Sequence, residues 1–336
     1  MNVWLQNLLV IVIVATIGWL LLRLLRSPAG TLLCGRFFRR RGARLSTAVL
    51  SLYLLLGVLN LIQVPGQLRN ASIIDLIFQS IPRERTYSAP LADRVLLAAN
   101  ESAENPVNRV RGIHLLGTDI NGYDVIYNVC RGCGTVLLLL TGTMLISFPL
   151  GTILGLLAGY FGGRIDDMVQ WLYNTISSIP WLLFVIAFLI LFGRSLFWIC
   201  LAFGLTSWVE LARLIRGETL KLREYTFIRA ARASGVPGSR ILIAHLFPNL
   251  SHIFIISFTL TATSIVLAES ILTFIGIGVQ PGSASWGLML VEAQIELVRT
   301  PPIWWVFVGA SFLGIFPLVL ALNIFGDRLR DALEPE

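Results

Sequence analysis

Residues 224–249 read EYTFIRAARASGVPGSRILIAHLFPN, a polar segment set between two hydrophobic stretches. The apolar positions of its first half recur at helical spacing and predict a short helix: Tyr225, Phe227, Ile228 and Ala231. Arg229 and Arg232 lie three residues apart on the more polar side of that helix. A membrane loop with this pattern is expected to have a defined helical fold rather than to be an irregular connection.

The second half of the segment carries the signals of a turn and another helix. Gly235 can adopt the left-handed backbone conformation that commonly ends a helix, and Pro237 prevents the first helix from continuing. Ser239 is placed to cap a second short helix, which is expected to stop at Pro248 and Asn249. A helix-turn-helix at a membrane surface is suited to being bound by another protein. The alternative interpretation is an amphipathic helix that lies on lipid headgroups.

The composition is that of a polytopic membrane protein. Of the 336 residues, 56% are hydrophobic and 13% are charged, and the mean hydropathy is +0.78. Soluble globular domains are about 25% charged. Seven stretches approach the ~20 residues that cross a hydrocarbon core. They cover residues 4–22, 46–64, 133–159, 170–192, 196–212, 250–276 and 303–325. Pro149, Pro180 and Pro317 fall within these spans and are candidates for kinks.

An arginine run near the N-terminus sets the expected orientation. It consists of Arg23, Arg26, Arg36, Arg39, Arg40, Arg41 and Arg44, with no acidic residue before Asp75. The positive-inside rule places this run in the cytoplasm, where its arginines can also contact anionic lipid headgroups. The net charge of +7 is therefore no sign of nucleic-acid binding. Alternation then puts residues 65–131 and 277–302 outside and residues 213–249 inside, and a short helix is expected near 91–103.

The 224–249 segment closely resembles the cytoplasmic coupling loop of ABC importer permeases. The shared pattern is a pair of alanines, a glycine four residues after the second alanine, and a Pro-Asn about thirteen residues later. The form found here resembles the dipeptide/oligopeptide/nickel permease family, C-type subunit. The resemblance assigns ATPase coupling to Glu224, Tyr225, Ala230, Ala231, Arg232, Gly235, His245, Pro248 and Asn249. It also implies that Ala231→Trp would uncouple transport without preventing membrane insertion.

Four further stretches resemble elements of the same family. They are HLLGTDINGYD at 114–124, GYFGGRID at 159–166, ESILTFIGIGVQPGSASWG at 269–287 and NIFGDRLRDALEP at 323–335. Tyr123 stands where family members commonly have arginine, and Gly282 and Ala284 replace two prolines. The first element is interpreted either as a collar at the entrance or as the cap of the following helix. The third is expected to contain a short helix over 286–298.

Three residues in or beside the spans are candidates for the pathway or a subunit interface: Glu269, Pro180 and Trp286. A carboxyl group in an apolar span is costly and rarely faces lipid. For Glu269 a structural, hydrogen-bonded role is the other interpretation, and both remain open at this point.

Several chemistries are excluded or disfavoured by missing residues. The single lysine, Lys221, follows Leu220, so a phosphate-binding G-x-x-x-x-G-K-[ST] loop is impossible and no nucleotide is hydrolysed by that chemistry here. The histidines, at 114, 245 and 252, form no ligand cluster, and Cys130 and Cys133 have no second cysteine pair. We therefore expect no enzyme activity, cofactor or metal in this chain, with ATP and Mg²⁺ bound by partner ATPases.

The predicted fold is an all-α polytopic membrane protein of about seven transmembrane helices. Its expected parts are an extra N-terminal helix and basic loop (1–35), the family's N-terminal transmembrane helix (36–65), an external segment (66–124), a five-helix importer-type core (125–326) with coupling loop 213–249, and a cytoplasmic tail (327–336). The resemblance implies a bacterial inner-membrane protein with four kinds of partner: a homologous permease, two ATPase subunits, an extracytoplasmic peptide-binding protein and the lipid bilayer.

The expected cargo is di- and oligopeptides, with nickel, haem or antimicrobial peptides as alternatives. A gradient-driven secondary transporter would favour paired intramembrane charges and inverted repeats, neither of which is visible. A membrane-embedded enzyme or scaffold is the third possibility, and the lack of a catalytic constellation argues against it.

Overall fold

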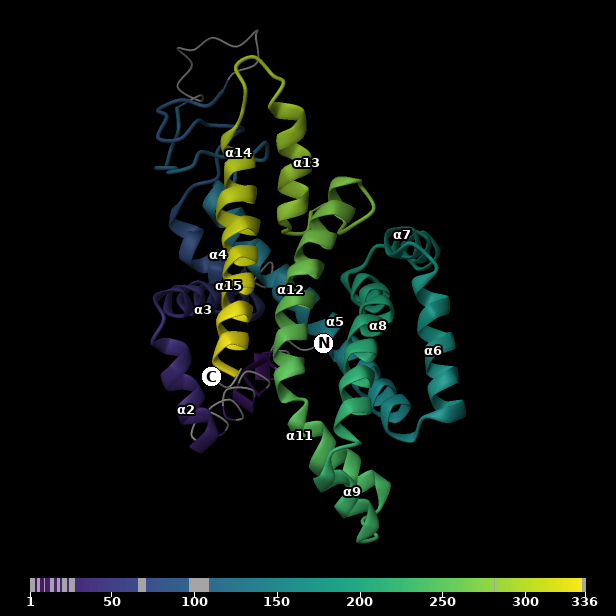
Figure 1. Cartoon of the computed structure of the whole chain (residues 1–336). Helices are drawn as coiled ribbons and strands as arrows, with labels where there is room; N and C mark the ends of the chain where they lie inside the picture. The colour runs from purple at the N-terminus through teal and green to yellow at the C-terminus, as the bar shows by residue number, and fades with distance from the viewer. Residues whose placement is uncertain are drawn as a thin grey trace. The chain divides into compact units, whose positions relative to one another are not determined.

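The computed structural model describes residues 28–65, 71–96, 109–280 and 282–333, together with scattered positions before residue 28, and it is mainly helical (Figure 1). Within the described residues, five helices are long and apolar enough to cross a membrane. These are Arg41–Leu61, Val125–Phe161, Leu196–Leu222, Ser251–Phe274 and Trp305–Leu333. The predicted helical membrane fold is confirmed, whereas the predicted 4–22 span lies largely outside the described residues.

The predicted span 170–192 is not one straight helix. The structure has α6 (Gly163–Ser177) and α7 (Trp181–Phe192), bent by 79° at the break between them. Pro180 is the N-cap of α7, with an extended ψ of 121°. Proline disfavours a helical conformation in the residue before it and cannot donate a backbone hydrogen bond, so the helix ends there. Counted as one broken span, this pair would be the sixth.

The chain divides into two compact units. Unit 1 comprises residues 1–138 and 266–324, and unit 2 comprises residues 139–265 and 325–336. Unit 1 holds α2 (Pro28–Phe38), α3 (Arg41–Leu61), β1 (Gln63–Val64), β2 (Ala71–Ser72), α4 (Ile73–Ile77), η1 (Phe78–Ser80), α13 (Trp286–Glu296), α14 (Trp305–Val308) and η4 (Gly309–Ile315). Unit 2 holds α6, α7, α8 (Leu196–Leu222), α9 (Thr226–Ala233), α10 (Gly238–Arg240), η3 (Ile241–Leu246) and α11 (Phe247–Asn249). The division passes through α5 (Val125–Phe161), α12 (Ser251–Phe274) and α15 (Phe316–Leu333).

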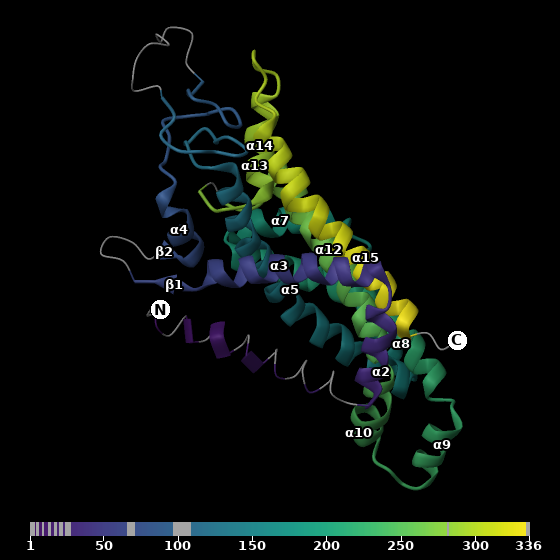
Figure 2. The same ribbon diagram turned by 90° about the vertical axis from the view of Figure 1, so that its left-hand side faces the viewer.

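In unit 1, a short hairpin follows α3 and leads into α4 (Figure 2). Ser72 and Asp75 form a capping box: the Ser72 hydroxyl accepts from the Asp75 N–H at 3.1 Å, and the Asp75 carboxylate accepts from the Ser72 N–H at 2.8 Å. The expected helix near 91–103 is absent over residues 91–96, which form a turn and an extended bridge between Ser88 and Val95. Its remainder lies outside the described residues.

Helices α14, η4 and α15 form one continuous helix, which begins in unit 1 and has a wide π-helical stretch over η4. Pro317 follows that stretch and has no N–H for the carbonyl of Leu313 four residues earlier. The hydroxyl of Tyr53, from α3, donates to that carbonyl instead. Tyr53 thus gives this carbonyl a donor in place of the N–H that Pro317 lacks.

In unit 2, α6 and α7 both pack on α8 (Figure 1). The second half of α5 approaches α8 closely through glycines at four-residue spacing. A Cβ at Gly155 would lie 2.9 Å from the Ile215 Cβ, and one at Gly159 would lie 2.6 Å from the Thr219 Cβ. Gly151 faces α8 in the same way. Small residues at this spacing let membrane helices pack backbone to backbone.

Candidate functional site

The 224–249 segment folds as two helices joined by a glycine turn, as the sequence predicts. Helix α9 ends at Ala233, and Gly235 adopts a φ of +78°. The Gly235 N–H donates to the Arg232 carbonyl and the Val236 N–H to the Ala231 carbonyl, both at 3.1 Å. This pair of bonds is a Schellman motif, which satisfies the last carbonyls of the helix.

The second helix begins differently from the prediction. Pro237, rather than Ser239, is the N-cap of α10, and no side chain caps it. Proline is suited to a helix start because its fixed φ is already helical and its missing N–H would be unpaired there. The helix runs on through η3 and ends with α11 at Asn249, where the Asn249 side chain donates to the His245 carbonyl at 2.6 Å. The predicted stop at Pro248-Asn249 is correct.

One side of the segment is packed against the rest of unit 2. Ile228 is fully buried in an apolar cluster together with Leu156, Tyr160, Leu211, Ile215, Ile241, Leu242, Leu246, Leu250 and Ile253. Ala231 is half-buried and packs against the same cluster. The structure therefore places Ala231 on the inner side of α9, where a large side chain would disturb the loop's own packing.

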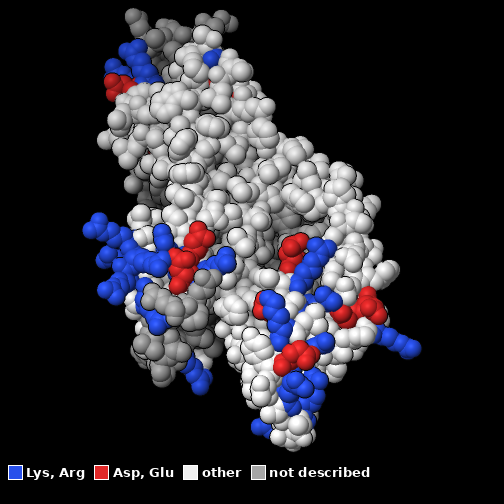
Figure 3. All heavy atoms as spheres, in the orientation of Figure 1, with Lys and Arg blue, Asp and Glu red and all other residues white. Residues whose placement is uncertain are grey.

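The other side of the segment is exposed. Tyr225 is 55% exposed and Phe227 43% exposed, with their rings edge to face at 6.2 Å. Ala230 is exposed between the arginines 229 and 232. In Figure 3 the charged side chains of unit 2 gather over α9 and the neighbouring ends of α6 and α8. We call the exposed residues Tyr225, Phe227 and Ala230 the outer face of α9; it combines apolar area with a charged border.

Contacts at its base hold the segment to unit 2. The Arg223 guanidinium donates to the Gly159 carbonyl at 3.0 Å and to the Glu224 carboxylate at 3.2 Å. The Arg232 guanidinium lies over the Tyr160 ring, 5.1 Å from its centroid. Two helical turns before Arg223, Arg216 forms a two-bond ion pair with Asp166, with Nη2 and Oδ2 2.7 Å apart. The glycine turn of residues 159–166 is thus more than a connection, because it anchors residues 224–249, which we call the coupling segment after their predicted role.

Gly235→Val should destabilise this segment by about 1–2 kcal/mol through the backbone alone, since a non-glycine residue at positive φ is strained and β-branching adds to the strain. The added side chain would meet no atom within 4 Å, so no clash contributes. Gly235→Asn, which tolerates this conformation, is the matched control. Limited proteolysis of the loop in the purified protein measures the effect. Equal cleavage of both variants and the unaltered chain would contradict the assigned turn.

Comparisons with known proteins show the family of this chain. Residues 151–336 match the family described as "Binding-protein-dependent transport system inner membrane component". The chain is 35% identical over 227 residues to the oligopeptide transport system permease protein OppC of Haemophilus influenzae, covering 68% of this chain and 72% of that protein. The chain belongs to this permease family. The permease is also 36% identical over 224 residues to the dipeptide transport system permease protein DppC of Bacillus subtilis, covering 66% and 69% of the two chains.

A solved structure of the inward-facing MetNI methionine ABC transporter shows a more distant likeness. It has 17% identity and a TM-score of 0.46, and it covers 61% of the permease and 94% of that chain.

Glu269 lies in the interior of unit 1 and is 2% exposed. Its Oε1 accepts hydrogen bonds from the Thr273 hydroxyl at 2.9 Å and the Ser285 hydroxyl at 2.7 Å, while Oε2 has no hydrogen-bond partner among the described residues. Ser285 also caps α13 by accepting from the Gly287 N–H at 3.1 Å. Glu269 therefore fastens the start of α13 to the end of α12, in agreement with the structural alternative of the sequence analysis.

Glu269→Gln should keep this connection, because the amide oxygen can accept from both hydroxyls, whereas Glu269→Leu should break it. Leaving the two buried hydroxyls unpaired costs about 1–3 kcal/mol each. We expect a lower unfolding temperature of the purified permease for the leucine variant and little change for glutamine. An equal loss in both variants would show that a charge, rather than an acceptor, is required at this position.

Trp286 is fully buried beside this connection. Its indole N–H donates to the Val129 carbonyl at 3.0 Å, and its ring packs edge to face on Tyr53 at 5.9 Å. The ring occupies a slot between Gly132 and Gly314: a Cβ at Gly314 would lie 2.9 Å from the indole, and one at Gly132 would overlap it. The third pathway candidate, Pro180, is exposed at the α6–α7 bend of unit 2.

A buried polar cluster in the segment predicted to be external was not foreseen from the sequence. His114 is 2% exposed, and its ring nitrogens face two carboxyl groups: Nδ1 lies 2.9 Å from Asp124 Oδ2, and Nε2 lies 3.3 Å from Glu84 Oε1. Glu84 Oε1 also accepts from the Arg111 and Gly112 N–H groups. We call Glu84, His114 and Asp124 the external clasp.

The clasp is joined directly to the start of α5. Asp124 Oδ1 accepts from the Ile126 N–H at 2.7 Å and the Tyr127 N–H at 3.3 Å, which makes Asp124 the cap of that helix. The capping interpretation of the HLLGTDINGYD element is confirmed by these two hydrogen bonds, and the collar at the entrance stays a prediction. The sequence contained His114 and Asp124 in one motif, but Glu84 lies 30 residues away with no motif of its own.

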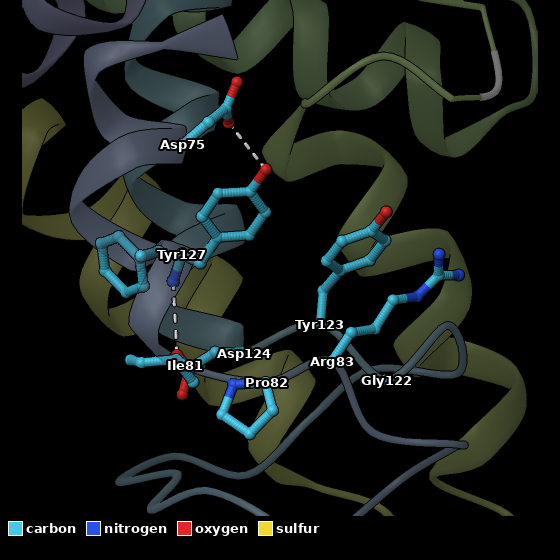
Figure 4. Close-up of a pocket in the computed structure, with 9 residues that line it drawn as sticks. Asp75, Ile81, Pro82, Arg83, Gly122, Tyr123, Asp124 and Tyr127 are labelled. Carbon is cyan, nitrogen blue, oxygen red and sulfur yellow. Dashed lines mark hydrogen bonds between the residues drawn. The ribbon is translucent and has the colours of Figure 1, made fainter. Parts of the chain in front are cut away.

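A small cavity of about 160 Å³ lies beside the clasp, where the loop after η1 crosses the start of α5 (Figure 4). It is lined by Asp75, Phe78, Ile81, Pro82, Arg83, Gly122, Tyr123, Asp124 and Tyr127. The Tyr127 hydroxyl donates to Asp75 at 2.7 Å, and the Arg83 guanidinium lies 4.4 Å from the Tyr123 ring centroid. Burial raises the pKa of Asp75, but hydrogen bonds from Ser72 and Tyr127 outweigh it and leave the pKa below its ordinary value.

Metal-binding chemistry has no geometric support within the described part of the chain, where no three His, Cys, Asp or Glu side chains are arranged to hold an ion. Cys133 is buried and Cys130 half-buried near the start of α5. The candidate site that the structure does assemble is the coupling segment. All nine of its predicted residues lie between the end of α8 and the end of α11.

Proposed function

We propose that this permease forms one half of the translocation pathway of an ATP-driven importer for di- and oligopeptides in the bacterial inner membrane. The observation that carries the proposal is that the two sides of the coupling segment, residues 224–249, differ. Its inner side is packed and tethered to unit 2, while the outer face of α9 presents Tyr225, Phe227 and Ala230. An amphipathic helix of this kind is suited to a groove on another protein. Relatives named for oligopeptide and dipeptide transport support the cargo class.

The partners follow from this arrangement. The second half of the pathway is a homologous permease, and an extracytoplasmic binding protein delivers the peptide. Two ATPase subunits bind ATP and Mg²⁺, because the chain has no phosphate-binding loop of its own. Closure of the ATPases displaces α9 and the end of α8. The Arg223–Gly159 contact carries that displacement to the end of α5, and the Arg216–Asp166 contact carries it to the start of α6.

The test is affinity purification of the tagged permease from native membranes, with identification of co-purifying proteins by mass. We expect a second permease, two ATPases and a binding protein. ATP hydrolysis by the reconstituted assembly is then measured with a dipeptide, a longer peptide, Ni²⁺ or haem added. Stimulation by peptides supports the proposal, and stimulation only by Ni²⁺ or haem reassigns the cargo. A permease that purifies alone, folded and without an ATPase, would favour a gradient-driven transporter.

A further inference from the structure

We propose that the corner between α2 and α3 is a binding site for the headgroup of an anionic phospholipid. The two helices meet at this corner, since α2 ends at Phe38 and α3 begins at Arg41 (Figure 2). Arg36, Arg39, Arg41 and Arg44 are all exposed there, and the sequence has no acidic residue before Asp75. The corner is therefore a cationic surface without acidic neighbours in the surrounding sequence.

The faces of α3 connect this cationic corner to the lipid-exposed surface. At 100° per residue, Arg41 and Arg44 lie on the same side of the helix as Leu45, Leu52 and Leu55. Those leucines are 68%, 52% and 55% exposed, respectively. The opposite side holds the buried residues Ala43, Ser46, Tyr53 and Gly57. One continuous stripe of α3 thus carries two arginines at one end and exposed leucines along the rest.

The dimensions of this stripe fit one lipid molecule. From Arg44 to Leu55 the helix rises through eleven residues, about 16 Å, which is close to half of a hydrocarbon core about 30 Å thick. A phosphate bound between Arg41 and Arg44 would leave its acyl chains beside these leucines, since all of them lie on one side of α3. Arginine forms two-point hydrogen bonds to phosphate oxygens, which favours a phosphate bearing a net negative charge. A second protein would instead need acidic groups beside an apolar surface of the same length.

The experiment is native mass spectrometry of the tagged permease purified with the subunits that accompany it. Phosphatidylglycerol and phosphatidylcholine with identical acyl chains compete for binding. We expect the unaltered protein to retain phosphatidylglycerol in preference to phosphatidylcholine. Arg41→Gln with Arg44→Gln should reduce that preference at least tenfold, given that an arginine near an anionic surface changes binding about fivefold. Arg41→Lys with Arg44→Lys should retain most of it, because the charge remains.

The matched control is Arg109→Gln with Arg111→Gln, which removes the same charge from exposed positions of the external segment. Equal retention of both lipids by the unaltered protein would overturn the proposal. So would a glutamine pair at 41 and 44 that has no more effect than the control pair. A glutamine pair that keeps the lipid preference but loses a co-purifying subunit would identify the corner as a protein contact instead. None of these outcomes depends on the cargo, so the lipid site and the proposed transport function are tested separately.

Discussion

Ala230→Trp is expected to reduce peptide uptake at least tenfold while leaving the permease folded in the membrane. Ala230 is exposed on the outer face of α9, so an indole at this position adds bulk to the docking surface without entering the packed cluster. A docking helix whose backbone must approach a groove closely tolerates no large side chain at the contact. Uptake of a labelled peptide and co-purification of the ATPases are the two measurements, and both should fall together.

The position matters, because the neighbouring alanine does not give the same test. Ala231 packs against the apolar cluster, so Ala231→Trp would uncouple transport through damage to the loop itself. The control for Ala230→Trp is Ala187→Trp, which adds the same side chain at an exposed position of α7. Normal uptake and normal ATPase retention in the Ala230→Trp variant would contradict the docking model for the outer face of α9.

His114→Leu is expected to destabilise the external part of unit 1 by about 3–5 kcal/mol, the usual cost of removing one partner from a buried charged cluster. The ring lies between the buried carboxyl groups of Glu84 and Asp124 and supplies a contact to each. Without it, two carboxyl groups share a dry site, and the cap of α5 loses its support. The unfolding temperature of the purified permease and protease cleavage between residues 84 and 124 measure the loss.

Two variants sharpen this prediction. His114→Gln keeps a polar group in the site and can still donate to one carboxylate, so we expect an intermediate loss. His252→Leu makes the same change at an exposed histidine and should have little effect. If leucine at 114 were tolerated as well as leucine at 252, the external clasp would not be a stabilising element.

The features that sequence predicted best depend on local rules. Gly235 ends α9 because only a residue that accepts positive φ fits a Schellman turn, and that requirement is visible in a single position. The long spans follow from hydropathy, although their ends differ by several residues where helices continue into water: α8 runs to Leu222 instead of stopping near residue 212. The stop of the second coupling helix at Asn249 is likewise local.

The features that sequence missed depend on distant partners. Glu84 and His114 are 30 residues apart, and nothing in either neighbourhood indicates that they meet. Which of two adjacent alanines faces inward depends on the cluster around Ile228 and not on α9 alone. The close packing of α5 on α8 was also missed, although the sequence does indicate it. Glycines 151, 155 and 159 repeat every four residues, the spacing that lets membrane helices pack closely.

The slot around Trp286 has a consequence for how this permease and its relatives diverge. Gly132 and Gly314 leave no room for a methyl group beside the indole, so neither glycine can be replaced while the tryptophan stays in place. A smaller residue at position 286 would free both positions, and a larger residue at either would then be tolerated. Across an alignment of relatives, positions 132, 286 and 314 should therefore change as a correlated set, and isolated substitutions at any one of them should be rare.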